Sequence, residues 1–162
     1  MSEISDLLER FRRGPELVAV SITGAAGSEL DFVPEPGQWS IRQIVAHLSD
    51  AEIVATMRMR QILAEENPRL EVWDHDAWGK NLDYARRKPS QSLETFRRIR
   101  GENYELLKDL PESAFERAGS HSGRGRMTLR ELLRLMAEHA ESHGAQLRAR
   151  RAEFKAAKAV AQ

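Results

Sequence analysis

The chain of 162 residues contains no cysteine, which excludes disulfide bridges, cysteine metal ligands and a thiol nucleophile of its own. It also has no excess of either charge, because 25 basic residues balance 25 acidic ones. Nucleic-acid and anionic-membrane surfaces need a basic excess, so we expect neither partner. No apolar run approaches the roughly 20 residues that span a bilayer, and the first residues lack a signal-peptide pattern. We therefore expect a cytoplasmic protein.

Alternating strand patterns and internal repeats are also missing, whereas helical periodicity is present. Four stretches repeat apolar residues at intervals of three and four, namely 15–26, 40–63, 89–110 and 128–150. Four amphipathic helices without strands predict an all-α protein, a four-helix bundle formed as a single domain over residues 1–162. Because Pro15 should interrupt a helix, we expect residues 1–12 to form an N-terminal turn. The alanine- and lysine-rich residues 152–162 are expected to form a frayed tail.

Two of these stretches begin with a capping box, in which a side-chain oxygen is followed three residues later by Glu or Gln. Ser40 and Gln43 form the first box, and Thr128 and Glu131 form the second. The sequence therefore predicts well-defined starts for the second and fourth helices.

Histidines interrupt the apolar stripes of these two helices. His139 and His143 are four residues apart, so their side chains lie on one helix face with Cβ atoms roughly 5–6 Å apart. His47 lies on the apolar face of the 40–63 helix. Partly solvated histidines would explain the pair, but three buried imidazoles need partners. A shared divalent ion would satisfy all three and leave an open fourth position, as in catalytic zinc sites.

The long connection of residues 65–88 carries two of the three tryptophans and one of the two tyrosines. Trp78 and Tyr84 are candidates for the wall of a substrate pocket, although they could equally plug the open side of the bundle. Asp74, His75 and Asp76 are consecutive and share no face, so we do not expect a metal site there. His121 lies in a predicted loop and is not an expected ligand either.

The positions of the histidines along their helices predict the topology. The three histidines lie at the same level along the bundle axis if the 40–63 and 128–150 helices run antiparallel. The long connection allows the second and third helices to run parallel. This gives an up-down-down-up bundle. Trp78 and Tyr84 would then lie near the histidines, whereas the glycine-rich loop with Arg124 and Arg126 would be flexible and lie at the opposite end.

Two segments resemble a known family. The segment from Pro36 to Arg42, followed by His47-Leu48-Ser49-Asp50-Ala51-Glu52 and Arg58, resembles the "W-S…H-L-x-D-x-E…R" signature of the DinB/YfiT-like metalloenzymes. The segment from Glu138 to Gln146 is similar to their "H-x-x-x-H-x-x-Q" ending. The resemblance spans nearly the whole chain. It implies a four-helix bundle, a nickel, zinc or iron ion bound by His47, His139 and His143, and a homodimer.

The resemblance also implies a class of chemistry. Relatives include thiol-dependent S-transferases and a maleylpyruvate isomerase that use low-molecular-weight thiols such as mycothiol or bacillithiol. We therefore expect a metal-dependent thiol S-transferase or a hydrolase acting on a small-molecule substrate, with a thiol cosubstrate or water as nucleophile. Asp50, one turn from His47, is a candidate partner or base, or else a surface carboxylate. Glu52 and Arg58 are interpreted as structural charges.

A non-catalytic function remains the alternative. A metal ion can stabilise a fold directly, so the bundle could serve as a dimerisation or small-ligand-binding module. An open coordination position beside a pocket would separate the two hypotheses.

Overall fold

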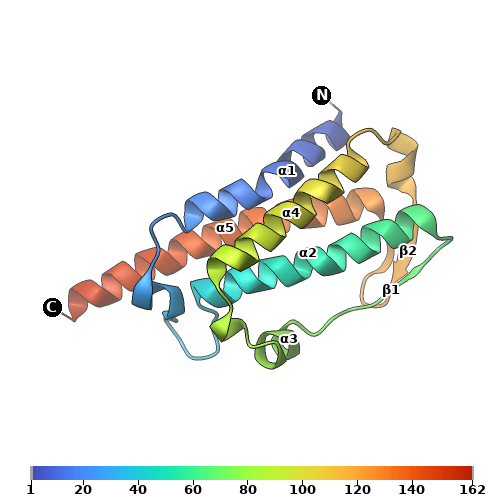
Figure 1. The fold of residues 1–162 in the computed structure, drawn as a ribbon. Helices are drawn as coiled ribbons and strands as arrows, with labels where there is room; N and C mark the ends of the chain where they lie inside the picture. The colour runs from blue at the N-terminus through green and yellow to red at the C-terminus, as the bar shows by residue number, and fades with distance from the viewer. Residues whose placement is uncertain (1, 162) are drawn as a thin grey trace.

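A computed structural model describes residues 2–161 and contains five α-helices and a small three-stranded sheet (Figure 1). The helices are α1 Glu3–Ser21, α2 Ile41–Ala64, α3 His75–Asn81, α4 Pro89–Leu107 and α5 Leu129–Val160. The strands are β1 Arg69–Leu70, β2 Ala118–His121 and β3 Gly125–Thr128, and short 3-10 helices cover Gly27–Asp31, Tyr84–Arg86 and Glu112–Glu116. In Figure 1, α2 and α4 run parallel to each other and opposite to α1 and α5. The predicted up-down-down-up four-helix bundle is confirmed.

Both predicted capping boxes are present at the starts of the histidine-bearing helices. The Ser40 N–H donates to Gln43 Oε1 at 2.9 Å, and the Gln43 N–H donates back to Ser40 Oγ. Thr128 and Glu131 make the same reciprocal pair at the start of α5. The starts of α2 and α5 are therefore set by local hydrogen bonds that the sequence already predicts.

The predicted break in the first helix is wrong, because α1 continues through Pro15 from Glu3, and most of residues 1–12 are helical. Proline cannot donate a hydrogen bond to the carbonyl four residues earlier, which is that of Phe11. Arg100 on α4 supplies the missing donor, since its Nη1 donates to Phe11 O at 2.8 Å. Gly14 allows this approach, because a Cβ there would lie 2.6 Å from Arg100 Nη1.

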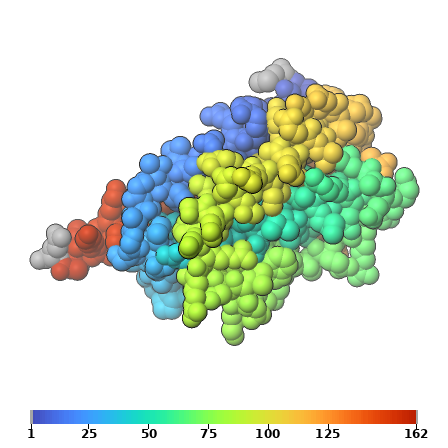
Figure 2. Space-filling view, viewed as in Figure 1, coloured from blue at the N-terminus to red at the C-terminus, as the bar shows by residue number. Residues whose placement is uncertain are grey.

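The expected frayed tail is also wrong, because α5 continues to Val160. Alanine and lysine have high helix propensity, so this segment extends the helix without needing a core to pack against. Phe154 anchors it to Phe32, with ring centroids 5.5 Å apart, and Figure 2 shows this end of α5 projecting beyond the rest of the molecule. Residues 1 and 162 of the predicted termini lie outside the described residues.

A three-stranded sheet replaces the flexible loop expected around Arg124. β2 and β3 form an antiparallel hairpin, and β1 pairs with β2 in parallel, with Arg69 opposite Ser120. Gly119 permits this pairing, because a Cβ there would lie 2.8 Å from Pro68 O. The sheet fastens the residues that follow α2 to those that precede α5 (Figure 1).

The interior consists of two apolar clusters, with buried polar side chains between them. On α2, Leu48 belongs to one cluster and Ala51 and Ala55 belong to the other, and the buried Glu52 lies near this transition. Arg100 donates to both Glu52 carboxylate oxygens at 2.8 and 2.7 Å, and Asn103 donates to one of them at 3.1 Å. The middle of the bundle is therefore polar.

Among residues 2–161, no helix combines the length and apolar character needed to cross a bilayer.

Candidate metal centre and the adjoining cavity

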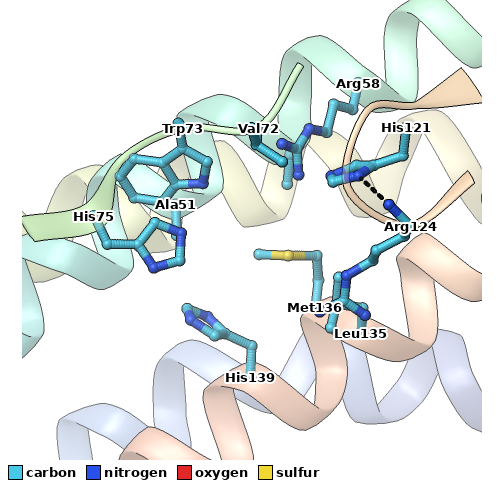
Figure 3. Close-up of a pocket in the computed structure, with 11 residues that line it drawn as sticks. Ala51, Arg58, Val72, Trp73, His75, His121, Arg124, Leu135, Met136 and His139 are labelled. Atoms are coloured by element: carbon cyan, nitrogen blue, oxygen red, sulfur yellow. Dashed lines mark hydrogen bonds between the residues drawn. The ribbon is translucent and has the colours of Figure 1, made fainter. Parts of the chain in front are cut away.

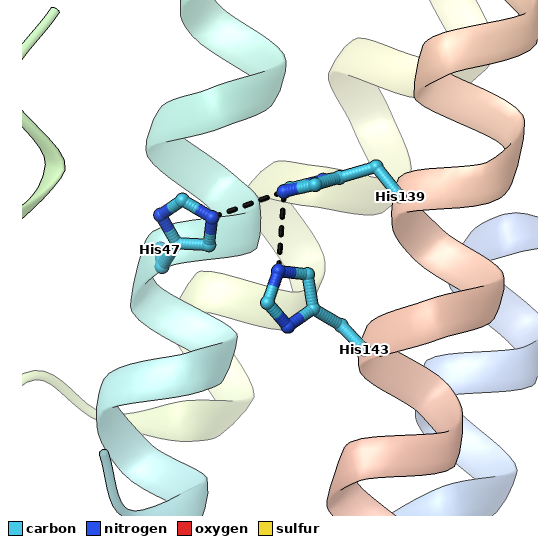
Figure 4. A group of neighbouring side chains, drawn as sticks. All are labelled: His47, His139 and His143. Carbon is cyan, nitrogen blue, oxygen red and sulfur yellow. Dashed lines mark hydrogen bonds between the residues drawn. The ribbon is translucent and has the colours of Figure 1, made fainter. Parts of the chain in front are cut away.

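Three histidine side chains meet in the middle of the bundle, as the sequence predicts. His47 projects from α2, and His139 and His143 project from successive turns of α5 (Figure 4). The Nε2 atom of His139 lies 3.0 Å from Nε2 of His47 and 3.1 Å from Nε2 of His143. The structure therefore brings together the three residues proposed as metal ligands, with their nitrogen atoms within 4.8 Å of one another.

Burial keeps these imidazoles neutral. It lowers the pKa of His47 to about 2, helped by the neighbouring imidazoles of His139 and His143. It lowers the pKa of His139 to about 3 and also lowers the pKa of His143. Neutral imidazoles keep a nitrogen lone pair at neutral pH, which is the form that ligates a metal.

A hydrogen bond sets the tautomer of His143. Its Nδ1 lies 2.7 Å from Gln146 Oε1, and because this oxygen only accepts, Nδ1 carries the proton. The Nε2 lone pair of His143 therefore faces the other two rings. Separations near 3 Å suit one ion bound at about 2.0–2.1 Å from each nitrogen. The residues present thus fit a divalent cation.

Aromatic rings enclose His47. Trp73 stacks against it with centroids 5.6 Å apart and planes 11° apart, and the Trp39 centroid lies at 5.0 Å. His75 lies next to Trp73, and its ring centroid is 5.2 Å from that of His47. These rings limit the access of water to one side of the cluster.

A cavity of about 340 Å³ opens next to His139. Figure 3 shows His139, His75 and Trp73 at one end, and Arg58, His121 and Arg124 at the other. The remaining lining residues are Ala51, Ala55, Val72, Leu135 and Met136. The cavity therefore joins the histidine cluster to a group of positively charged and hydrogen-bonding side chains.

The placement of Arg124 corrects the sequence-based prediction, which put its loop at the far end from the histidines. The hairpin does lie beside the end of α2 and the start of α5, but its turn folds back along the cavity. Arg124 therefore lines the same cavity as His139. Arg58, which was interpreted as a structural charge, lines it as well.

The two aromatic pocket candidates do not line this cavity. Tyr84 is fully buried and donates its hydroxyl to Asp50 Oδ2 at 2.7 Å. Trp78 packs edge-on against Trp73 with centroids 4.7 Å apart, which places it behind the wall. The extended residues before α3, including Trp73, form the wall instead.

Asp50 is not the partner of His47. Its two oxygens accept hydrogen bonds from Tyr84 and from Arg87 Nη1, the latter at 2.8 Å. His47 Nδ1 has no hydrogen-bond partner. Asp50 therefore joins α2 to the segment between α3 and α4, and it is not free to act as a base.

The position of one further cavity residue can be inferred from the sequence. Arg58 follows His47 by eleven residues, which is three helical turns, so the two share a face of α2. Trp73 lies in an irregular segment and His75 begins the seven-residue α3, whereas His121 ends β2 and Arg124 lies in the hairpin turn. None of these segments is long enough to show a period that would mark the residue.

The fold and the site together define a four-helix-bundle protein with a three-histidine centre. The chain belongs to the DinB superfamily, whose family model matches residues 10–147.

Two relatives have names that describe a metal-dependent hydrolase. YfiT of Bacillus subtilis (strain 168), named as a candidate metal-dependent hydrolase, is 32% identical over 117 residues, which cover 72% of this chain and 66% of that protein. A candidate metal-dependent hydrolase of Oceanobacillus iheyensis is 27% identical over 144 residues, covering 88% of this chain and 78% of that protein.

Two solved structures share the fold. The structure of Bacillus subtilis YfiT, described as a probable metal-dependent hydrolase with an unusual four-helix bundle topology, superposes with a TM-score of 0.88 and 25% identity, covering 96% of this chain and 90% of YfiT. The mycothiol-dependent maleylpyruvate isomerase superposes with a TM-score of 0.72, covering 90% of this chain and 61% of the isomerase. At 14% identity, the latter shows a common fold alone.

Proposed function

We propose that this chain is a metal-dependent enzyme that hydrolyses a small-molecule substrate. A divalent ion, nickel, zinc or iron, would be held by the Nε2 atoms of His47, His139 and His143. The observation that carries this proposal is the convergence of three neutral imidazoles beside an open cavity. A purely structural metal site is usually closed by four protein ligands, whereas a catalytic one keeps a position open.

The ion, when bound, supplies Lewis acidity to the reacting group. The chain's own residues orient the ligands and handle protons. Gln146 holds His143 in the ligating tautomer. His75 lines the cavity, and burial lowers its pKa, so it is neutral at pH 7 and can accept a proton at a ring nitrogen.

No side chain that lines the cavity bears a thiol, hydroxyl or carboxylate. We infer that the nucleophile enters with the substrates. Water would give hydrolysis, the activity in the names of the relatives described above. The same observation supports a second candidate, S-transfer from a low-molecular-weight thiol cosubstrate, because a chain without cysteine needs an external thiol.

The test is metal analysis of the chain purified without a histidine tag, followed by activity assays. We expect about one divalent ion per chain, and turnover of an ester, amide or electrophilic thiol acceptor that a chelator abolishes and added metal restores. Turnover only with added thiol would select S-transfer. A bound ion without turnover in any assay would favour the non-catalytic dimerisation or ligand-binding module, and failure to retain any divalent ion would contradict the metal site itself.

We also propose, from the family resemblance, that the chain forms a homodimer in the cytoplasm. Light scattering of the purified chain measures the first point, and fractionation of the source cells measures the second. A monomer at micromolar concentration would contradict the dimer.

A further inference from the structure

Arg58 is a buried cation without an anionic partner. Its side chain is 9% exposed, it forms no ion pair within residues 2–161, and its Nε has no hydrogen-bond partner. Its Nη2 donates to the carbonyl of Glu71, which holds the guanidinium in the cavity wall. Arginine does not give up its proton in proteins, so the charge stays. Burial of an unpaired charge is strongly unfavourable, and this one lies in the wall of a cavity.

Two other groups at the same end of the cavity favour an anion. Arg124 is exposed, forms no ion pair among the described residues and lines the cavity beside Arg58 (Figure 3). His121 is buried, and its Nδ1 accepts hydrogen bonds from the N–H groups of Gly123 and Arg124 at 3.0 and 3.1 Å. Since Nδ1 accepts, the ring proton lies on Nε2, and His121 is a hydrogen-bond donor.

The middle of the cavity has a different character. Between Arg58 and His139 the lining is apolar, and Ala51, Ala55 and Met136 are among its residues. Figure 3 shows Met136 between the arginines and His139. A molecule that fills about 340 Å³ is small, near the lower limit of ordinary ligand pockets. The cavity therefore matches a short apolar body with a charged group at one end.

We propose that the substrate carries an anionic group that Arg58 binds, with Arg124 and His121 as additional donors. Its apolar body lies along the middle of the cavity and its reacting end lies at His139. The position of the reacting end rests on the proposed metal-dependent function, whereas the anion subsite depends on the cavity alone. Arg58 is thus a substrate-binding residue that selects anions over neutral and cationic molecules.

Carboxylate, phosphate and sulfonate groups share the chemistry that a guanidinium recognises, so the test includes all three. Isothermal titration calorimetry would compare hexanoate, butyl phosphate and pentanesulfonate with neutral hexanamide and with hexylamine. The full-length chain would be used both loaded with zinc and after chelation. We expect at least one anion to bind about tenfold or more tightly than hexanamide in both forms, because charge-assisted hydrogen bonds are roughly twice as strong as neutral ones.

Variants locate the subsite. Arg58→Gln should weaken binding of the preferred anion about tenfold or more while leaving hexanamide unchanged, and Arg124→Gln should weaken it by a smaller factor. Arg126→Gln is the matched control on the same hairpin, because Arg126 is exposed and donates to the Glu116 carbonyl away from the cavity. Its affinity should equal that of the unchanged chain. Thermal unfolding would confirm that each variant is folded. If Arg58→Gln does not fold, the affinity of Arg124→Gln for the anion still tests the proposal.

Two results would overturn the proposal: hexanamide binding as tightly as all three anions, or equal anion affinity in the unchanged chain, Arg58→Gln and Arg124→Gln. Failure of the metal-dependent function looks different. In that case the chain retains no zinc, yet the chelated protein still binds the anion through Arg58.

Discussion

Two polar clusters lie buried at the middle of the bundle, and they differ in how their hydrogen bonds are met. Around Arg100, the guanidinium and the Glu52 carboxylate satisfy each other, and the Phe11 carbonyl and Asn103 complete the network. In the other cluster, His47 Nδ1 and His139 Nδ1 have no partner, and neither does Arg58 Nε in the adjoining cavity.

The difference separates structural from functional polar groups. Only one other buried side-chain nitrogen or oxygen in residues 2–161, Nε of Arg150, lacks a partner. Unsatisfied buried polar groups oppose folding, and three of these four atoms lie on two of the rings whose Nε2 atoms converge and on Arg58 in the cavity wall. We infer that polar groups are kept in this place for binding and not for stability. The Arg100 network is expected to contribute to stability, whereas the histidine cluster is expected to contribute to binding.

The largest effect should come from breaking the satisfied network. Glu52→Gln leaves the Arg100 guanidinium buried without a carboxylate and should lower the free energy of unfolding by about 3–5 kcal/mol. Urea denaturation measures this. Glu141→Gln is the matched control, because the Arg10–Glu141 pair is 35% exposed on both sides and should contribute no more than about 1 kcal/mol. Similar losses of unfolding free energy in the two variants would contradict the larger contribution assigned to the buried network.

Acid should act on the histidine cluster of the metal-free chain. The folded pKa values of His47 and His139, about 2 and about 3, lie below the ordinary value of 6.5. The unfolded chain therefore binds more protons, and stability present above pH 6.5 is lost as the pH falls. The loss should approach about 1.4 kcal/mol per pH unit for each histidine. Urea denaturation between pH 7 and 5 measures it, and a His47→Gln variant with an unchanged slope would contradict it.

Metal binding should distinguish the clustered histidines from the other two. His143→Ala removes a proposed ligand and should weaken zinc affinity by more than roughly 100-fold, the upper range for residues that only support a ligand. His75→Ala and His121→Ala should each leave the affinity nearly unchanged. Competition with a chromogenic chelator under one protocol compares all three. Equal losses would mean that the ligands are misassigned.

The smallest of these effects should come from Gln146. Gln146→Ala removes the acceptor that fixes the tautomer of His143, and it should weaken zinc affinity about tenfold without changing the stoichiometry. Gln61→Ala on α2 is the control, because Gln61 lies outside the cluster. The same chelator competition measures both variants, and an unchanged affinity in Gln146→Ala would show that packing alone orients His143.

The parts of the fold that follow local rules could be predicted from the sequence. The capping boxes at Ser40 and Thr128 mark the starts of α2 and α5, and helical periodicity places His47, His139 and His143 on inward faces. Placing these residues at one level along the bundle axis predicts that α2 and α5 are antiparallel, and the structure agrees. Each of these inferences depends on residues within a few turns of one another.

Most of the errors share a cause, which is contact between distant segments; the tail is the exception, because the helix propensity of its alanines and lysines is local. Pro15 is accommodated because Arg100, 85 residues later, donates to Phe11 O. β1 has two residues and no period to detect, and its pairing with β2 spans some fifty positions. Arg124 reaches the cavity only because that pairing positions the hairpin. Tertiary contacts of this kind leave no pattern in the neighbouring sequence.

The aromatic enclosure of the histidines also has an optical consequence. All three tryptophans of the chain lie at this one place: Trp39 and Trp73 flank His47, and Trp78 packs on Trp73. The tryptophan fluorescence of the chain therefore originates next to the proposed ion and hardly reports on the remote ends of the bundle. A closed-shell ion such as zinc should leave most of the emission intact, whereas open-shell nickel at the same nitrogens should quench it. The chain thus carries its own spectroscopic reporter, which would distinguish a closed-shell from an open-shell ion at the proposed site.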